Sequence, residues 1–241
     1  HYFSSSINKK KNVRWMGISA LIVGGIVLPI YLQPNLSTTI LLVVIWFSML
    51  WISGIPTKYV VILGIVGVIG AISVFPFLED YQQNRILTFL QPEEGARYGD
   101  TYNVEQALIT IGSGGLLGQG YGAATQVQLR FLKVRSTDYI FSAIAAEFGF
   151  VGTLFIIAVL VFIILRCIKA AREAGDTYGA LIAYGFATLI GFQTMVNIGV
   201  NLRVIPVTGQ TLPFISYGGS SLLSLLLGIG LIQSVLLHRQ S

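Results

Sequence analysis

The chain has 241 residues, of which 54% are hydrophobic and only 10% are charged, and its mean hydropathy is +0.76. This balance excludes an ordinary soluble domain, in which about 25% of residues are charged. The net charge of +5 and the pI near 9.4 are what basic flanks of membrane spans produce, so they give no argument for nucleic-acid binding.

Apolar stretches long enough to cross a bilayer as helices, about 17–25 residues each, recur along the chain. We expect an all-α polytopic bundle, because lipid offers no partner to an open strand edge and the alternation of a membrane barrel is absent. We predict one membrane domain over residues 1–241 with a polar outer loop over residues 78–137. The predicted spans are residues 15–32, 37–55, 59–77, 140–165, 178–200 and 221–237.

The distribution of basic residues indicates the orientation. Six spans put both termini on one side, and that side carries nine of the 15 lysines and arginines but two of the ten acidic residues. The other side carries six basic and eight acidic residues. The positive-inside rule therefore predicts cytoplasmic termini and an outward-facing loop. Because the chain begins with His1 and a polar tail, we expect a piece of a longer membrane protein with further spans before it.

Three local signals precede Asp138 in the chain. Asn35 or Ser37 suits the N-cap position of the second predicted span. In the outer loop, residues 81–90 form an amphipathic pattern around Arg85 that is typical of an interfacial helix. Ser113 lies among glycines that interrupt a further helical stretch, and consecutive exposed N–H groups there would make an anion nest for a pyrophosphate. An ordinary glycine turn is the alternative.

Asp138 ends the polar loop where an apolar run begins, and a carboxylate at a membrane boundary indicates a functional site. Arg130, Lys133 and Arg135 precede it, and Glu147 follows nine residues later, about two and a half helical turns on. The cations fit a clamp for a phosphorylated lipid, with Asp138 as a base and both carboxylates facing one cavity. A basic patch that holds lipid headgroups is the alternative.

Residues 206–221 contain two prolines and three glycines, so they cannot form a regular lipid-facing helix. We expect a re-entrant or cavity-lining segment, in which Ser216 and Tyr217 offer polar groups to bare backbone; a packed lid over the bundle is the alternative. His1 and His238 lie at the termini, so neither a zinc site nor a Ser-His-Asp triad is expected.

Several segments together resemble one family over nearly the whole chain. They are Gln33-Pro-Asn-Leu-Ser, Arg85-Ile-Leu-Thr-Phe-Leu, Ile111-Gly-Ser-Gly-Gly-Leu-Leu-Gly-Gln-Gly, Arg135-Ser-Thr-Asp-Tyr-Ile-Phe, Ala146-Glu-Phe-Gly, Asn197-Ile-Gly and Leu212-Pro-Phe-Ile-Ser-Tyr-Gly-Gly-Ser-Ser. In this order they resemble SEDS proteins, the RodA/FtsW/SpoVE group. The resemblance implies the last six of ten spans, a peptidoglycan glycosyltransferase that polymerises lipid II, and a class B penicillin-binding protein (a transpeptidase) as partner. It also implies that Asp138 is the essential outward-facing carboxylate.

The resemblance leads to one functional hypothesis with two rivals. An enzyme of the bacterial inner membrane would use Asp138 as general base, and Arg85 or the cations at 130–135 would stabilise the undecaprenyl pyrophosphate leaving group. A divalent cation (Mg²⁺ or Mn²⁺) is a further candidate for that role. The family usually has Asp-Leu-Gly at Asn35-Leu36-Ser37 and a His at Ser136. The first departure removes a second cavity carboxylate and favours a non-catalytic scaffold of the same fold; a lipid flippase is the other rival.

Overall fold

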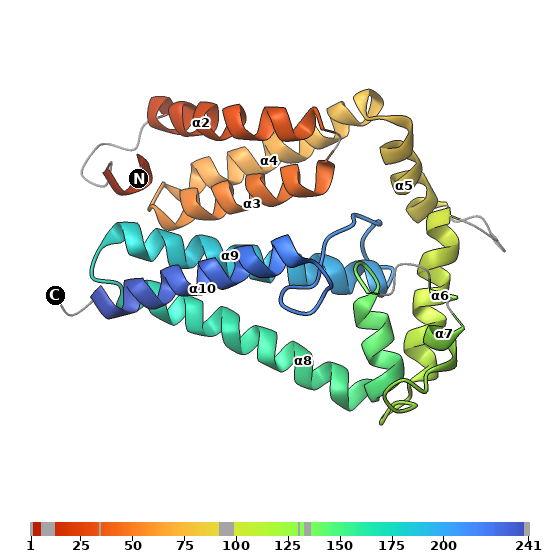
Figure 1. The fold of residues 1–241 in the computed structure, drawn as a ribbon. Helices are drawn as coiled ribbons and strands as arrows, with labels where there is room; N and C mark the ends of the chain where they lie inside the picture. Colours follow the sequence, from red (N-terminus) through yellow and green to blue (C-terminus); the bar gives the residue numbers. More distant parts are fainter. Residues whose placement is uncertain are drawn as a thin grey trace. The chain divides into compact units, whose positions relative to one another are not determined.

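The computed structural model describes residues 2–5, 13–33, 35–91, 99–129, 131–132 and 136–238, and these ranges contain helices and no strand. The long helices are α2 (Val13–Tyr31), α3 (Leu36–Ile52), α4 (Thr57–Val74), α8 (Ile140–Glu173), α9 (Thr177–Asn201) and α10 (Gly219–Leu237) (Figure 1). The short ones are α1 (Tyr2–Ser5), η1 (Phe75–Phe77), α5 (Asp80–Leu90), α6 (Gly99–Ser113) and α7 (Thr125–Gln128). The all-α class is confirmed, and one long helix lies over each range predicted as a span.

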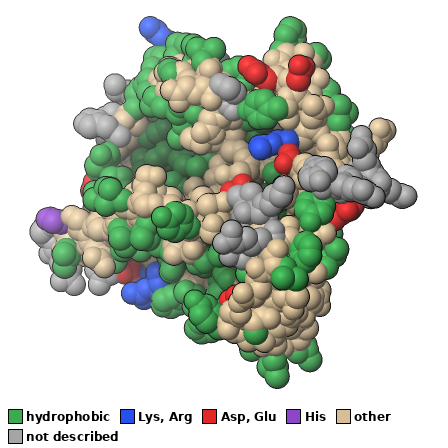
Figure 2. Space-filling model, turned by 45° about the vertical axis from the view of Figure 1, so that its right-hand side comes forward, with side chains coloured by type: hydrophobic (Ala, Val, Ile, Leu, Met, Phe, Trp, Pro, Cys, Tyr) green, Lys and Arg blue, Asp and Glu red, His purple; other side chains and the backbone are tan. Residues whose placement is uncertain are grey.

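Five of the described helices are long and apolar enough to cross a membrane: α2, α4 continued by η1, α8, α9 and α10. The sixth, α3, is apolar but has 17 residues. In the α4 span only 6% of residues are buried, and Figure 2 shows hydrophobic side chains over much of the visible face. Soluble monomers rarely expose so continuous an apolar surface, whereas lipid solvates it. The chain is a multi-pass membrane protein.

The chain divides into two compact units. Unit 1 is His1–Glu79, Ile164–Phe192 and Leu227–Ser241, and unit 2 is Asp80–Ile163 and Gln193–Leu226. Each of α8, α9 and α10 contributes one part to each unit. The single domain expected over residues 1–241 stays a prediction.

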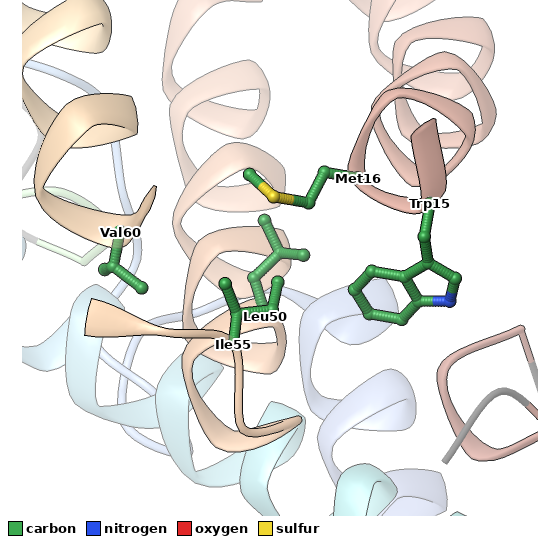
Figure 3. Packing of buried hydrophobic residues seen from close by; sticks show 5 residues of the cluster. All are labelled: Trp15, Met16, Leu50, Ile55 and Val60. Carbon is green, nitrogen blue, oxygen red and sulfur yellow. The ribbon is translucent and has the colours of Figure 1, made fainter. Parts of the chain in front are cut away.

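Unit 1 has its own apolar cluster at one end of its helices (Figure 3). Trp15 and Met16 of α2 meet Leu50 of α3, with Ile55 from the following turn and Val60 from α4, and each is at most 8% exposed. Hydrogen bonds between side chains supplement this packing, as polar residues do between membrane helices. Trp46 Nε1 donates to Ser19 Oγ at 3.3 Å, which ties α3 to α2, and the Ser48 and Thr188 hydroxyls lie 2.9 Å apart, which ties α3 to α9.

Helix α3 begins where the sequence offered two candidate caps, and the cap is Asn35. Its side-chain Oδ1 accepts a hydrogen bond from the Thr38 backbone N–H at 3.2 Å. This satisfies one of the backbone donors that the first turn of every helix leaves unpaired. Asn35 therefore has a structural role in unit 1.

Unit 2 contains a break that the sequence did not predict. Gly149 interrupts α8 with φ 68° and ψ −166°, so Ile140–Phe148 and Phe150–Glu173 are separate helical segments, and the chain turns sharply between them (Figure 1). The freed backbone groups pair with the glycine-rich loop after α6, residues 114–120. Gln119 and Gly120 N–H donate to the Ala146 and Glu147 carbonyls at 2.9 and 3.0 Å. Phe150 and Val151 N–H donate to the Gly115 and Leu116 carbonyls at 2.9 and 3.1 Å. The loop thus caps both segments and satisfies backbone groups that the ends of the two helical segments leave unpaired.

Candidate functional site

The candidate site is built around Asp138, which lies in unit 2 in the turn directly before α8. Its side chain is half-buried, and the next residue, Tyr139, is only 2% exposed. Its Oδ2 faces Gly209, where an added Cβ would lie 3.9 Å from it, an ordinary van der Waals distance. Gly209 has φ 75°, a conformation that L side chains rarely adopt. A glycine at this position therefore leaves space beside the carboxylate.

Two asparagines of α9 hold the main-chain carbonyl of Asp138. The Nδ2 groups of Asn197 and Asn201 donate to this oxygen at 3.0 and 2.9 Å. These two side chains are 1% and 0% exposed, and buried amides need partners because no water reaches them. Their spacing of four residues puts both on one face of α9, and that spacing on an apolar helix is the signal by which sequence reasoning could have found them.

The segment after α9 holds the two preceding carbonyls of the same turn. Ser216 Oγ donates to the Thr137 carbonyl at 2.7 Å and accepts the Leu212 N–H at 2.8 Å, and the Tyr217 N–H donates to the Ser136 carbonyl at 2.8 Å. Ser216 and Tyr217 thus lie against the Asp138 turn, although the Tyr217 side chain is 80% exposed. Their contacts are structural; substrate binding by them stays a prediction, as does re-entry of this segment into the membrane.

The environment of Asp138 makes it a stronger base than an exposed aspartate. Burial raises the pKa of its carboxyl, since the charged form loses hydration. A hydrogen bond from the Thr137 side chain and the positive charge of Arg85 oppose the rise in pKa, and the negative charge of Asp100 adds to it. The net direction is upward, toward the range in which a general base operates.

Arg85, predicted as a substrate contact, forms an ion pair in this region. Its Nε lies 3.3 Å from Asp100 Oδ2, and the two side chains are 36% and 34% exposed. A small pocket beside this pair is also lined by Arg203, which sequence reasoning did not single out. Arg203 has φ 56° and closes α9: its N–H donates to the Val200 carbonyl at 3.1 Å, and the Val204 N–H donates to the Gly199 carbonyl at 2.7 Å. This helix-ending geometry places a second cation beside Arg85.

The other predicted site residues differ in where they lie. Arg130, Lys133 and Arg135 are outside the described residues. Glu147 is half-buried at the far end of the first α8 segment, about 10 Å of helix rise from Ile140 at its start. Ser113 Oγ donates to the Thr110 carbonyl at 2.7 Å.

In the loop that follows Ser113, three successive N–H groups, those of residues 118, 119 and 120, donate to carbonyl oxygens of the chain. The anion nest expected around Ser113 itself stays a prediction. Substrate binding by Ser113 and Glu147 stays a prediction.

Two further features bear on ligands. A largely apolar groove of about 400 Å³ runs beside the start of α8, and its lining includes Ile111 of α6, Phe141 and Ala145 of the first α8 segment, and Ile157 of the second. Within the part of the chain that the structure describes, no three His, Cys, Asp or Glu side chains lie together to hold a metal ion.

The chain is similar to proteins of one family along its whole length. The family model named for FtsW, RodA and SpoVE, described as "Cell cycle protein", matches residues 1–241. The chain is 36% identical to "Peptidoglycan glycosyltransferase MrdB" of Escherichia coli (strain K12), covering 93% of this chain and 60% of that protein. It is 35% identical to "Stage V sporulation protein E" of Bacillus subtilis (strain 168), covering 94% of this chain and 62% of that protein.

A solved structure with a similar fold concerns polymerization and crosslinking by a peptidoglycan synthase complex. It matches with a TM-score of 0.79 and 30% sequence identity, over 99% of this chain and 66% of that chain. The chain therefore spans about three fifths of the length of the curated relatives named above. These matches and the helical fold show that the chain belongs to the FtsW/RodA/SpoVE family.

Proposed function

We propose that the complete protein is a peptidoglycan glycosyltransferase that polymerises lipid II at the outer face of the bacterial inner membrane, in cell elongation, division or sporulation. The observation that carries the proposal is Asp138: a half-buried carboxylate with a raised pKa, in a turn whose carbonyls are held by side chains and backbone from outside it, and subject to the charge of Arg85. Arg85 lines a small pocket, and Phe141, three residues after Asp138, lines an apolar groove. The relative at 36% identity is named a peptidoglycan glycosyltransferase, and the relative at 35% identity is named a stage V sporulation protein.

The proposed reaction transfers one proton and exchanges one bond at the anomeric carbon of the donor sugar. An acceptor sugar hydroxyl attacks the anomeric carbon of the donor and passes its proton to the Asp138 carboxylate. The bond between the anomeric carbon and the pyrophosphate oxygen breaks, and undecaprenyl pyrophosphate leaves. A base positioned in this way contributes on the order of 10²–10⁴ in rate, and its efficiency increases as its pKa approaches the working pH.

Cations would stabilise the negative charge that develops on the leaving pyrophosphate. Arg85 and Arg203 line one small pocket, the charge of Arg85 acts on Asp138, and Arg130, Lys133 and Arg135 are further candidates from the sequence. The apolar groove beside Phe141 suits part of a polyisoprenoid chain, because apolar walls are what binds such a chain. Together these groups would bind both ends of the lipid substrate.

The deciding experiment is polymerisation of purified lipid II by the complete protein with its partner, read as glycan chains on a gel. Asp138→Asn keeps the shape of the side chain and removes the proton acceptor, so the rate should fall on the order of 10²–10⁴ while lipid binding persists. Asp80→Asn is the matched control, since Asp80 is an exposed carboxylate of the same unit. Full activity of Asp138→Asn would exclude Asp138 as the base, and we would then prefer a scaffold or a flippase.

We also propose that a class B penicillin-binding protein is the partner and that both termini of this segment are cytoplasmic. The first proposal is supported by the similar structure, which concerns polymerization together with crosslinking. The second is supported by the basic flanks. Cysteines introduced at Tyr121, which is 85% exposed, and at Gly175, in the link between α8 and α9, test the orientation. An impermeant thiol reagent should label only Tyr121→Cys from outside. Labelling of Gly175→Cys alone would reverse the proposed orientation, and labelling of both would contradict the placement of the two sites on opposite faces.

A further inference from the structure

The start of α8 departs from regular helical hydrogen bonding at Asp138. In an α-helix the carbonyl of residue 138 would accept the N–H of residue 142. The next pair does so, because the Ala143 N–H donates to the Tyr139 carbonyl at 3.2 Å. The Ser142 N–H instead donates to Asn201 Oδ1 at 3.1 Å, and the Asp138 carbonyl accepts from side-chain amides. Asp138 therefore stays one residue outside the helical ladder.

The Asn201 carboxamide stands between the two backbone groups that would otherwise bond to each other. Its Nδ2 donates to the Asp138 carbonyl at 2.9 Å, and its Oδ1 accepts both the Ser142 N–H and, at 2.6 Å, the Ser142 hydroxyl. Asn201 and Ser142 are both 0% exposed. A single side-chain amide thus satisfies a donor and an acceptor of the helix start, which a buried site requires.

Asn197 supports the same arrangement from one turn earlier on α9. Its Nδ2 is shared between the Asp138 carbonyl at 3.0 Å and the Gln210 carbonyl at 2.8 Å. The turn before α8 is then held at three successive carbonyls by groups from outside it: Ser136 by the Tyr217 N–H, Thr137 by the Ser216 hydroxyl, and Asp138 by the asparagines. The direction of the carboxylate follows from this backbone geometry.

We propose that Asn201 is a positioning residue for the general base: its inserted amide prevents the Ser142 N–H from closing on the Asp138 carbonyl, and so keeps Asp138 out of α8 with its carboxylate toward Gly209. Without the amide, the two backbone groups would pair directly and wind Asp138 into the first turn of α8. Each residue added to a helix is rotated by about 100° from the next, so the carboxylate would leave its position. This inference rests on the proposed function, since it needs Asp138 to be the base.

The test is a set of substitutions at Asn201 in the complete protein with its partner. Asn201→Leu keeps the branching at Cγ and removes the amide, and Asn201→Ala repeats the test if the larger leucine side chain prevents folding. Thr194→Val is the control: Thr194 is 8% exposed on the same helix, and its hydroxyl has no hydrogen-bond partner among the described residues. Thermal unfolding of each purified variant establishes that the protein compared is folded.

Lipid II polymerisation is then measured as kcat and KM across pH. For Asn201→Leu we expect kcat to fall about 10- to 100-fold with KM changed less than about threefold, because orientation affects the chemical step rather than binding. The acid limb of the kcat profile should move to lower pH as Asp138 leaves its buried position near Arg85 and Asp100. Thr194→Val should change neither quantity.

The outcomes separate the inference from the proposed function. If the unsubstituted protein polymerises lipid II and Asp138→Asn does not, but Asn201→Leu and Asn201→Ala keep kcat and the position of the acid limb, the positioning role is refuted. A fall in kcat without movement of the acid limb also refutes it, because a general structural defect would produce that result. If Asp138→Asn is fully active, the proposed function itself fails.

Discussion

Replacement of Gly118 by alanine should destabilise the protein much more than the same replacement at Gly120, two residues along the same loop. Both glycines have positive φ, 81° and 95°, so each substitution carries the backbone strain of an L residue, about 1–2 kcal/mol. They differ in their surroundings. A Cβ at position 118 would lie 2.2 Å from the Glu147 carbonyl oxygen and 2.6 Å from the Gly149 N, whereas a Cβ at position 120 meets nothing closer than Ala123 Cβ at 3.8 Å.

The clash at position 118 involves backbone atoms, which cannot move without loss of the hydrogen bonds that cap the α8 break. Separation of the loop from α8 would break the bonds from Gln119 N–H to the Ala146 carbonyl and from Gly120 N–H to the Glu147 carbonyl. Two net hydrogen bonds are worth about 1–3 kcal/mol together. With the strain, Gly118→Ala should cost about 2–5 kcal/mol and Gly120→Ala about 1–2 kcal/mol.

Thermal unfolding in one detergent, followed side by side for the two variants and the parent, measures this difference. The expected order of apparent Tm is parent, then Gly120→Ala, then Gly118→Ala with a gap of several degrees to the second. Equal Tm values for the two variants would refute the reasoning, because they would mean that the close approach of the loop to the α8 break contributes nothing.

Two further predictions concern Asp138 and Asn35. Burial raises the folded-state pKa of Asp138 above its unfolded value, so ionisation removes stability as pH rises through the folded pKa; Asp138→Asn should therefore unfold at a higher temperature than the parent at neutral pH, with the difference vanishing at acidic pH. A difference that grows as pH falls would contradict the direction of this shift. Asn35→Ala should cost about 1 kcal/mol through loss of the α3 cap, and Asn35→Asp should retain the cap and the stability, both measured by thermal unfolding. Equal unfolding temperatures for Asn35→Ala and the parent would show that the cap is not needed.

The sequence predicted the helices well because span length and apolar content depend only on neighbouring residues. It also anticipated that bare backbone near Pro206–Ser221 would need hydroxyl partners, and Ser216 supplies one to both Leu212 and Thr137. What it missed are pairings between distant positions. Nothing local to Gly149 indicates a break there, because the groups that cap it lie about thirty residues earlier in the chain.

The same reason explains the residues of the candidate site that were missed. Asn201 acts on a carbonyl 63 residues away, and a motif read along the chain cannot specify such a contact. Arg203 itself takes the left-handed conformation that ends α9, and this places it in the pocket lining. The sequence does not indicate this, because that conformation favours glycine over arginine. Asp138 was found because a carboxylate is costly at a membrane boundary whatever surrounds it.

The break in α8 also connects two stretches of unit 2 that are distant in the sequence. Four backbone hydrogen bonds join the loop at residues 114–120 to the two segments of α8, and they act on both sides of Gly149. The loop and the segment Ile140–Phe148 are thereby joined through main-chain atoms, and Asp138 lies two residues before the start of this segment. Large hydrophobic side chains in and directly after this loop are exposed: Leu116, Leu117 and Tyr121 are 72%, 80% and 85% exposed. Main-chain hydrogen bonds thus connect this loop to the segment that begins two residues after Asp138, and no side chain between them has to change its rotamer.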